Sequence, residues 1–119
     1  MVELNAEMIL AASDIKSKVV PVEVPEWGGT VHLRVMTAGE RDAHELEWMA
    51  AKEKGGGVSD FRTKLLVRCL CDSAGKRIFT DAQIEGLKQK SADVVDRLWK
   101  QSMVVNKLTE AAVEAAAGE

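Results

Sequence analysis

Apolar and polar positions alternate most regularly between residues 19 and 40. Two short runs there place a hydrophobic residue at every second position, which predicts two half-buried strands. Gly28 and Gly29 stand between the runs, and glycine supplies the positive φ that a tight reversal needs. The segment therefore predicts a β-hairpin, whose first strand should be an edge strand because Pro21 has no amide donor. The alternating apolar residues are Val20, Val22 and Val24, then Val31, Leu33 and Val35, with His32 and Arg34 expected to face solvent.

A helix is expected directly after the hairpin, from about Ala38 to about Glu53. Thr37 and Glu40 have the spacing of a capping box, in which each side chain accepts a hydrogen bond from the other residue's amide. One side of this helix is apolar and is expected to face the core, and His44 and Trp48 fall on the opposite side. The apolar residues are Ala43, Leu46, Met49 and Ala50, and Gly55–Gly57 should end the helix.

The next helix should start at a cap formed by Ser59 or Asp60 and run to about Cys71. Apolar residues cover a wide face of it, so it is expected to be the most deeply buried helix, with Leu65, Leu66 and Leu70 in the main core. Its polar side is expected to be solvated, with an Asp60–Lys64 ion pair, although a patch for an acidic partner is the alternative. That polar side consists of Arg62, Lys64 and Arg68.

Two shorter patterns complete the chain after an extended piece at residues 76–79. Thr80 and Gln83 form a second capping box that opens a short helix, and Ser91 should cap the last helix. Asn5 can cap a short helix near the N-terminus. Residues 1–119 are thus predicted to form one α+β domain, mostly helical, with a two-stranded hairpin and about four helices. Looser packing is expected at residues 1–18 and 110–119.

Composition narrows the class of protein and its partners. Hydrophobic residues make up 46% and charged residues 29%, which is typical of a soluble globular domain. The net charge is -3, so a nucleic-acid partner is not expected. No apolar run approaches the roughly 18 residues of a membrane span, so no membrane partner is expected either. Cys69 and Cys71 are expected to be reduced, buried thiols, since their spacing suits a mutual disulfide poorly.

Catalytic or metal chemistry needs convergent acids, bases, nucleophiles or ligands. The two histidines, His32 and His44, have no partner at a metal-binding spacing, and Gly55–Gly57 is not followed by the Lys-Ser or Lys-Thr of a phosphate loop. The sequence therefore predicts a protein that is not an enzyme and that has no cofactor or metal.

Five residues are candidates for binding a partner: Trp27, His44, Trp48, Trp99 and Met103. Large aromatic side chains are enriched in protein interfaces, and Trp48 falls outside the expected core stripe of its helix. Burial under neighbouring elements is the alternative for Trp48, and core packing is the favoured one for Trp99. Trp27, in the hairpin turn, either folds back over the hairpin or faces a partner. A groove between the helix of Trp48 and the last helix is one expected form of the site.

Residue combinations typical of one protein family extend over residues 3–109. The most distinctive is Glu26-Trp27-Gly28-Gly29 at the tip of the expected hairpin. Together, these stretches make the chain similar to the tail assembly chaperones of long-tailed, non-contractile bacteriophages. The other matching stretches are residues 22–25, 31–37 and 40–43, Phe61-Arg62, Leu65-Leu66, Cys69, Cys71-Asp72, residues 75–77 and 79–81, Ser91-Ala92, residues 96–98 and Asn106.

The resemblance implies several functional properties. Such chaperones act in the host bacterial cytoplasm, are absent from the mature virion, coat the long helical tape measure protein and keep it soluble. They are thought to recruit tail tube subunits, in many cases through a longer form made by ribosomal frameshifting, whose extension would begin near residues 111–119. Self-association is expected as well, because many copies would cover one long client. A generic interaction or regulatory module and a small enzyme are the rival hypotheses.

Overall fold

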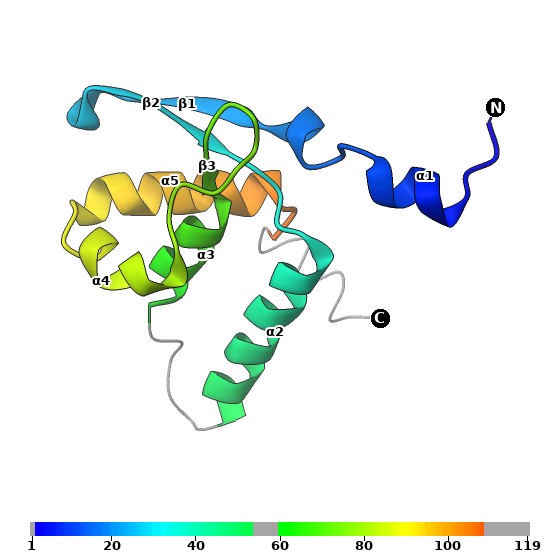
Figure 1. Ribbon diagram of the computed structural model, residues 1–119. Coiled ribbons are helices and arrows are strands. Elements are labelled where there is room, and N and C mark those ends of the chain that lie inside the picture. The colour runs from blue at the N-terminus through cyan, green and yellow to red at the C-terminus, as the bar shows by residue number, and fades with distance from the viewer. Residues whose placement is uncertain (1, 54–59, 109–119) are drawn as a thin grey trace.

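The computed structural model describes residues 2–53 and 60–108, which form an α+β fold (Figure 1). A small antiparallel sheet lies along helices α3 and α5, and α2 extends away from it. The predicted fold class is confirmed, although the sheet has three strands and not two. The helices are α1 (Ala6–Ala11), α2 (Ala38–Glu53), α3 (Phe61–Cys69), α4 (Ile84–Leu87) and α5 (Ala92–Val105), with 3-10 turns η1 (Lys16–Lys18), η2 (Pro25–Trp27) and η3 (Asp81–Gln83).

The predicted hairpin is confirmed. Strand β1 (Val20–Val24) pairs antiparallel with β2 (Gly29–Leu33), and Val22 lies opposite Val31. The turn η2 closes at Gly28, whose φ of 74° is a left-handed value that glycine adopts without a Cβ clash. Val24 and Leu33 are fully buried, so the alternating apolar face does turn toward the helices.

A third strand, β3 (Leu70–Cys71), was not predicted. It pairs with β2, which places Leu33 opposite Leu70 and leaves β1 at the sheet edge, as Pro21 suggests. The predicted helix boundary at Cys71 is therefore wrong, because α3 ends at Cys69 and Leu70 is already extended. The free amides and carbonyls of β2 account for the difference, since pairing with them satisfies the backbone groups that leave the helix.

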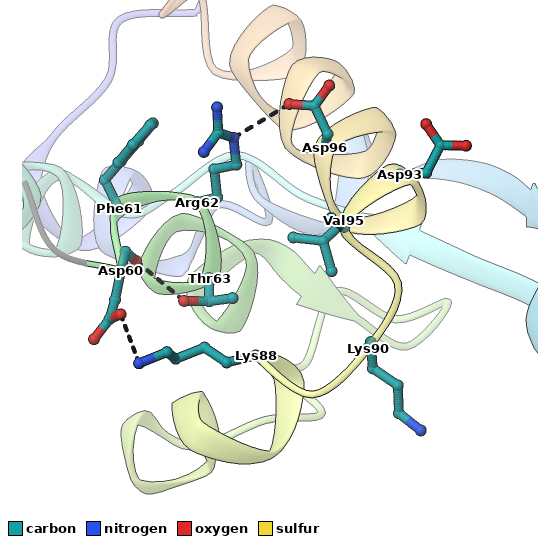
Figure 2. A pocket seen from close by; sticks show the side chains of 10 residues that line it. Asp60, Phe61, Arg62, Thr63, Lys88, Lys90, Asp93, Val95 and Asp96 are labelled. Carbon is teal, nitrogen blue, oxygen red and sulfur yellow. Dashed lines mark hydrogen bonds and ion pairs between the residues drawn. The ribbon is translucent and has the colours of Figure 1, made fainter.

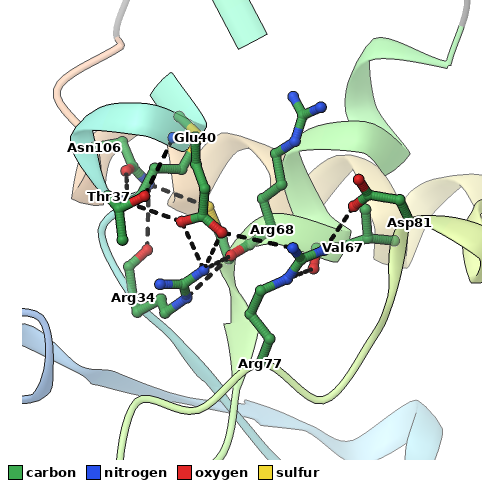
Figure 3. A network of polar contacts seen from close by, with 10 residues as sticks. Arg34, Thr37, Glu40, Val67, Arg68, Arg77, Asp81 and Asn106 are labelled. Carbon is green, nitrogen blue, oxygen red and sulfur yellow. Dashed lines mark hydrogen bonds and ion pairs between the residues drawn. The ribbon is translucent and has the colours of Figure 1, made fainter. Parts of the chain in front are cut away.

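Two arginines expected in solvent are buried. Arg34 is 5% exposed and donates to the Arg68 carbonyl from Nε (3.0 Å) and Nη2 (2.7 Å), so it caps the end of α3 (Figure 3). Its Nη2 also contacts both carboxylate oxygens of Glu40, at 2.8 and 2.7 Å. The side chain of Arg68, 7% exposed as a residue, turns toward α2. Charged partners supplied from other elements make this burial possible, and a pattern along one strand or helix does not show them.

The orientation of α2 is the reverse of the predicted one. Its apolar stripe faces solvent, with Leu46 and Met49 66% and 57% exposed, while His44 and Glu47 lie on the half-buried side. The capping box is confirmed: the Thr37 amide donates to Glu40 Oε1 at 2.9 Å, and the Glu40 amide donates to Thr37 Oγ1 at 3.2 Å. The buried arginines explain the reversal, since they need carboxylates from the polar side of α2.

The core forms between α3, α5 and the sheet. Leu65, Leu66 and Leu70 are all fully buried, as predicted. Cys69 and Cys71 are buried free thiols, also as predicted, and burial raises the pKa of Cys69 to about 12. The other buried apolar residues of this cluster are Val24, Leu33, Met36, Val67, Leu87, Val94, Val95, Leu98 and Leu108.

Polar interactions fix the ends of several elements. The Thr80 amide donates to Gln83 Oε1 at 2.8 Å in the predicted capping box, which opens η3 and then α4. Asn5 caps α1 by accepting from the Met8 amide at 2.9 Å, and α1 has no buried residue. Ser91 occupies the N-cap position of α5, as predicted, but its side chain makes no capping hydrogen bond there. The buried Asn106 accepts from the Met36 amide at 2.7 Å, which joins the end of α5 to the start of α2.

Three further predictions concern the start of α3, the glycine turn before it and the extended piece after it. Asp60, the N-cap residue of α3, forms an ion pair with Lys88 at 2.9 Å. The Gly55–Gly57 turn and the alternative cap Ser59 lie outside the described residues, as does the end of the chain from residue 109. The expected extended piece is present as a single bridge between Arg77 and Cys71.

Candidate partner-binding site

Three aromatic rings from three helices form one half-exposed surface. Phe61, at the start of α3, lies between Trp48 of α2 and Trp99 of α5, with centroid distances of 6.0 and 5.3 Å. Both pairs meet edge to face, at 80° and 81°, a favourable geometry for aromatic rings. Trp48 is 47% exposed, whereas Trp99 is partly buried against the core. A partner could therefore contact these rings on a surface already held in place by the fold.

Arg62 covers part of this surface. Its guanidinium carbon lies 4.7 Å from the centroid of Phe61 and 5.0 Å from that of Trp99, within the range of a cation–π contact. Its Nε also donates to Asp96 Oδ1 at 3.2 Å. We call Trp48, Phe61, Arg62 and Trp99 the aromatic patch. Met103, one helical turn after Trp99, is half-buried on the same side of α5.

An open depression adjoins the aromatic patch and shares Phe61 and Arg62 with it (Figure 2). It has a volume of about 920 Å³ and lies between the start of α3, the end of α4 and the start of α5. Ion pairs at its border, Asp60–Lys88 and Arg62–Asp96, measure 2.9 and 3.2 Å. Lys100 and Arg62 hold the pKa of Asp96 below its ordinary value. The lining residues are Asp60, Phe61, Arg62, Thr63, Lys88, Lys90, Ala92, Asp93, Val95 and Asp96.

His44 has a different environment from Trp48, although both belong to the same side of α2. Its Nδ1 lies 3.2 Å from Arg68 Nη1, and Arg68 Nη2 donates to Glu47 Oε1 at 2.7 Å. Burial, followed by the charge of Arg68, lowers the pKa of His44. A neutral imidazole can accept a hydrogen bond from the guanidinium, so His44 contributes to attaching α2 to α3.

Trp27 lies at the hairpin tip, apart from the aromatic patch: it takes part in none of the ring contacts found among the described residues. It is 36% exposed. Its neighbour Glu26 accepts two hydrogen bonds from Arg97 of α5, at 2.8 and 3.0 Å, and these lower the pKa of Glu26 to about 2. The pair holds the tip against α5. Of the five sequence candidates, the structure thus joins Trp48 and Trp99 through Phe61, places Met103 one helical turn from Trp99, and places His44 and Trp27 elsewhere.

Phe61 and Arg62 belong to the site, although neither was predicted there from the sequence. Phe61 is the first apolar residue of the wide face of its helix, and the sequence pattern assigns Arg62 to a solvated side. Only the folded arrangement shows that Phe61 lies between two tryptophans 13 and 38 residues away in the sequence. In the sequence, only the neighbouring aromatic and arginine residues at the start of this helix indicate a cation–π site.

The part of the chain that the structure describes contains neither a metal-binding cluster nor a membrane-spanning helix. No group of three or more His, Cys, Asp or Glu residues there could hold a metal ion. No helix within residues 2–53 and 60–108 is both long and apolar enough to cross a membrane.

Comparison with known proteins identifies the family. The model of the phage tail assembly chaperone family matches residues 5–117, nearly the whole chain. The chain belongs to this family. Among solved structures, the tail assembly chaperone of bacteriophage HK97 is similar, with a TM-score of 0.56 and 25% sequence identity over 73% of this chain and 79% of that chain. None of the curated proteins compared with the chain matches it significantly.

Membership of the tail assembly chaperone family is consistent with a protein-binding role for the aromatic patch. A chaperone acts by contacting another protein, and half-exposed aromatic side chains are suited to such contacts. The predicted resemblance to phage tail assembly chaperones is thus confirmed.

Proposed function

We propose that this tail assembly chaperone binds the tape measure protein, keeps it soluble and helps to bring tail tube subunits to it. The observation that carries the proposal is the aromatic patch, in which Trp48 remains 47% exposed although it contacts Phe61. Interface energy concentrates in a few aromatic and arginine side chains, and the patch contains both types. The family's role in tail assembly supports the proposal.

The patch suits an apolar segment of a helical client. Its rings are fixed by one another and by the core, so little side-chain entropy is lost on binding. The charged depression beside it allows polar residues of the client to remain paired or hydrated. A client helix that packs one apolar face over the three rings of Trp48, Phe61 and Trp99 fits this arrangement.

Several further properties belong to the same proposal. The chaperone acts in the host cytoplasm and is not retained in the virion. A longer form produced by frameshifting contacts the tail tube protein. The role is non-catalytic, as the chaperone family supports. Copies of the chain associate with one another, with Trp48 or Trp27 as the anchor.

Co-expression with the tape measure protein tests the proposal. We expect the client to become more soluble in the presence of the chaperone and to co-purify with it. Trp48→Ala should weaken the complex without changing the circular dichroism spectrum, because Trp48 is half exposed. Ile78→Ala is the control, since Ile78 is an apolar residue 51% exposed outside the patch. Equal client solubility with and without the chaperone, and no co-purification, would disprove the proposal.

A further inference from the structure

Helix α2 presents its apolar side to solvent. Leu46 and Met49 are 66% and 57% exposed, and Ala43 and Ala50 on the same side are exposed as well. We call these four residues the outer face of α2. A surface helix ordinarily buries its apolar stripe against the core. Here the stripe is exposed to water, and covering it would be energetically favourable. Figure 1 shows α2 extending from the body, with one side free of neighbouring described elements.

The inner side of α2 is fixed by charge, so the helix cannot turn its apolar side inward at low cost. Glu40 pairs with Arg34 at 2.7 Å, and Glu47 pairs with Arg68 at 2.7 Å. Both arginine side chains are less than 10% exposed, at 6% and 9%. Rolling the helix would leave these buried guanidinium groups without their carboxylates, which is strongly destabilising. The outer face is therefore available to a partner and not to the core of this chain.

The spacing and charge of this face define the partner. One row of side chains runs along the helix at the spacing i, i+4, i+7 and i+11. It consists of Asp42, Leu46, Met49 and Glu53. An exposed carboxylate stands at each end of the row, about 16 Å apart at 1.5 Å per residue. Between them, Ala43 and Ala50 are small enough to let another backbone approach closely. The row thus has an apolar centre and two acidic ends.

We propose that the outer face of α2 binds one helix of the client, in which an apolar seam is bracketed by two basic residues about three turns apart. This inference rests on the proposed function, because the client is the tape measure protein. The basic residues would pair with Asp42 and Glu53, and the seam would cover Leu46 and Met49. The aromatic patch binds a separate apolar segment of the same client.

A second copy of the chain fits this face poorly. If two outer faces paired antiparallel, Asp42 of one copy would meet Glu53 of the other, and parallel pairing would bring identical carboxylates together. Like charges directly opposed across a helix pair are destabilising. The charge pattern therefore selects a basic-bracketed helix over self-association at this surface.

Two synthetic helical peptides test the inference with the full-length protein. They share one leucine seam and differ only at two positions eleven residues apart, which are lysine in one peptide and glutamate in the other. We expect the lysine peptide to bind about tenfold more tightly at low salt and to lose this advantage as salt rises. The double substitution Leu46→Glu with Met49→Glu should weaken its binding about tenfold or more without changing the circular dichroism spectrum.

Val104→Glu is the matched control, because Val104 is an apolar residue of α5 that is 64% exposed. Absence of peptide binding, equal binding of both peptides, or an equal loss with Val104→Glu would overturn the inference. So would a self-associated wild type that becomes monomeric in the double variant, since a second copy would then occupy the face. Co-expression separates the two proposals. If the double variant still solubilises the client as well as the wild type does, only the inference fails, whereas a wild type that does not solubilise it disproves the proposed function.

Discussion

Arg68 and Glu47 form the closest charged contact between α3 and α2. Arg68 Nη2 donates to Glu47 Oε1 at 2.7 Å, and the Arg68 side chain is 9% exposed. The second oxygen, Glu47 Oε2, is also buried and has no hydrogen-bond partner among the described residues. The contact therefore keeps α2 in place at the cost of one unsatisfied acceptor. It also sets which side of α2 faces solvent.

Glu47→Ala is expected to lower the free energy of unfolding by about 1–3 kcal/mol, because Arg68 would keep a buried charge without its carboxylate. Urea denaturation followed by circular dichroism measures the change. Glu45→Ala is the control, since Glu45 is 55% exposed in its pair with Arg41 and should matter by less than about 1 kcal/mol. Equal losses in the two variants would show that the Arg68 contact does not stabilise α2.

His44 should make stability depend on pH. Burial and Arg68 lower its pKa from 6.5, so the unfolded chain binds a proton more readily than the folded one. The stabilising contribution is complete above 6.5 and is lost as the pH falls through the lowered pKa. We expect the midpoint of urea unfolding to decrease as the pH falls below 6.5.

The variant His44→Gln tests this assignment. Its amide oxygen can still accept from Arg68, but it does not titrate. The slope of stability against pH in this range should therefore become shallower than in the wild type. Arg41, Glu45 and Glu47 also act on His44, and they remain in the variant. An unchanged slope would assign the pH dependence to another group.

Alanine variants of Leu66 and Leu46 should differ in their free energy of unfolding. Leu66 is fully buried and Leu46 is 66% exposed. Leu66→Ala should cost about 2–5 kcal/mol through lost burial and a cavity. Leu46→Ala should stay within about 0.5 kcal/mol, as substitutions at the surface do. Thermal or urea unfolding of both variants measures the difference, and a loss below about 1 kcal/mol for Leu66→Ala would place α3 at the periphery.

Glu26 and Arg97 should control how the hairpin tip meets α5. The two hydrogen bonds from Arg97 lower the pKa of Glu26 to about 2. The stability that the pair contributes is present above 4.5, the ordinary value, and is lost as the pH falls toward 2. In Arg97→Gln, an NMR titration should show the pKa of Glu26 returning toward 4.5. A pKa that stays near 2 would assign the shift to other groups.

The elements set by local patterns could be predicted from the sequence. Alternation at Val22 and Val31, and the capping boxes at Thr37 and Thr80, depend on residues close in the chain, and the structure contains all of them. Leu66 was assigned to the core because its helix is apolar over a wide face. These features follow from periodicity and capping alone.

Long-range charge pairing could not be predicted in the same way. Arg34 and Arg68 lie 34 residues apart, and nothing in either local pattern shows that one would cap the helix of the other. The exposed apolar stripe at Leu46 follows from that pairing, because the carboxylates of α2 are drawn inward. The aromatic patch is likewise a product of folding, since it joins Trp48, Phe61 and Trp99 from three helices.

Trp48 and Trp27 are the predicted anchors of self-association. Both are partly exposed, at 47% and 36%, and Trp27 has no ring contact with the aromatic patch among the described residues. The acidic ends of the α2 outer face disfavour pairing there, which leaves these two tryptophans as the main candidates. Sedimentation velocity over a wide concentration range should show reversible growth of the species. Trp48→Ala or Trp27→Ala should shift that growth to higher concentration, and Ile78→Ala should not. A wild type that stays monomeric throughout would rule out these anchors and would require the client itself to arrange the chaperone copies.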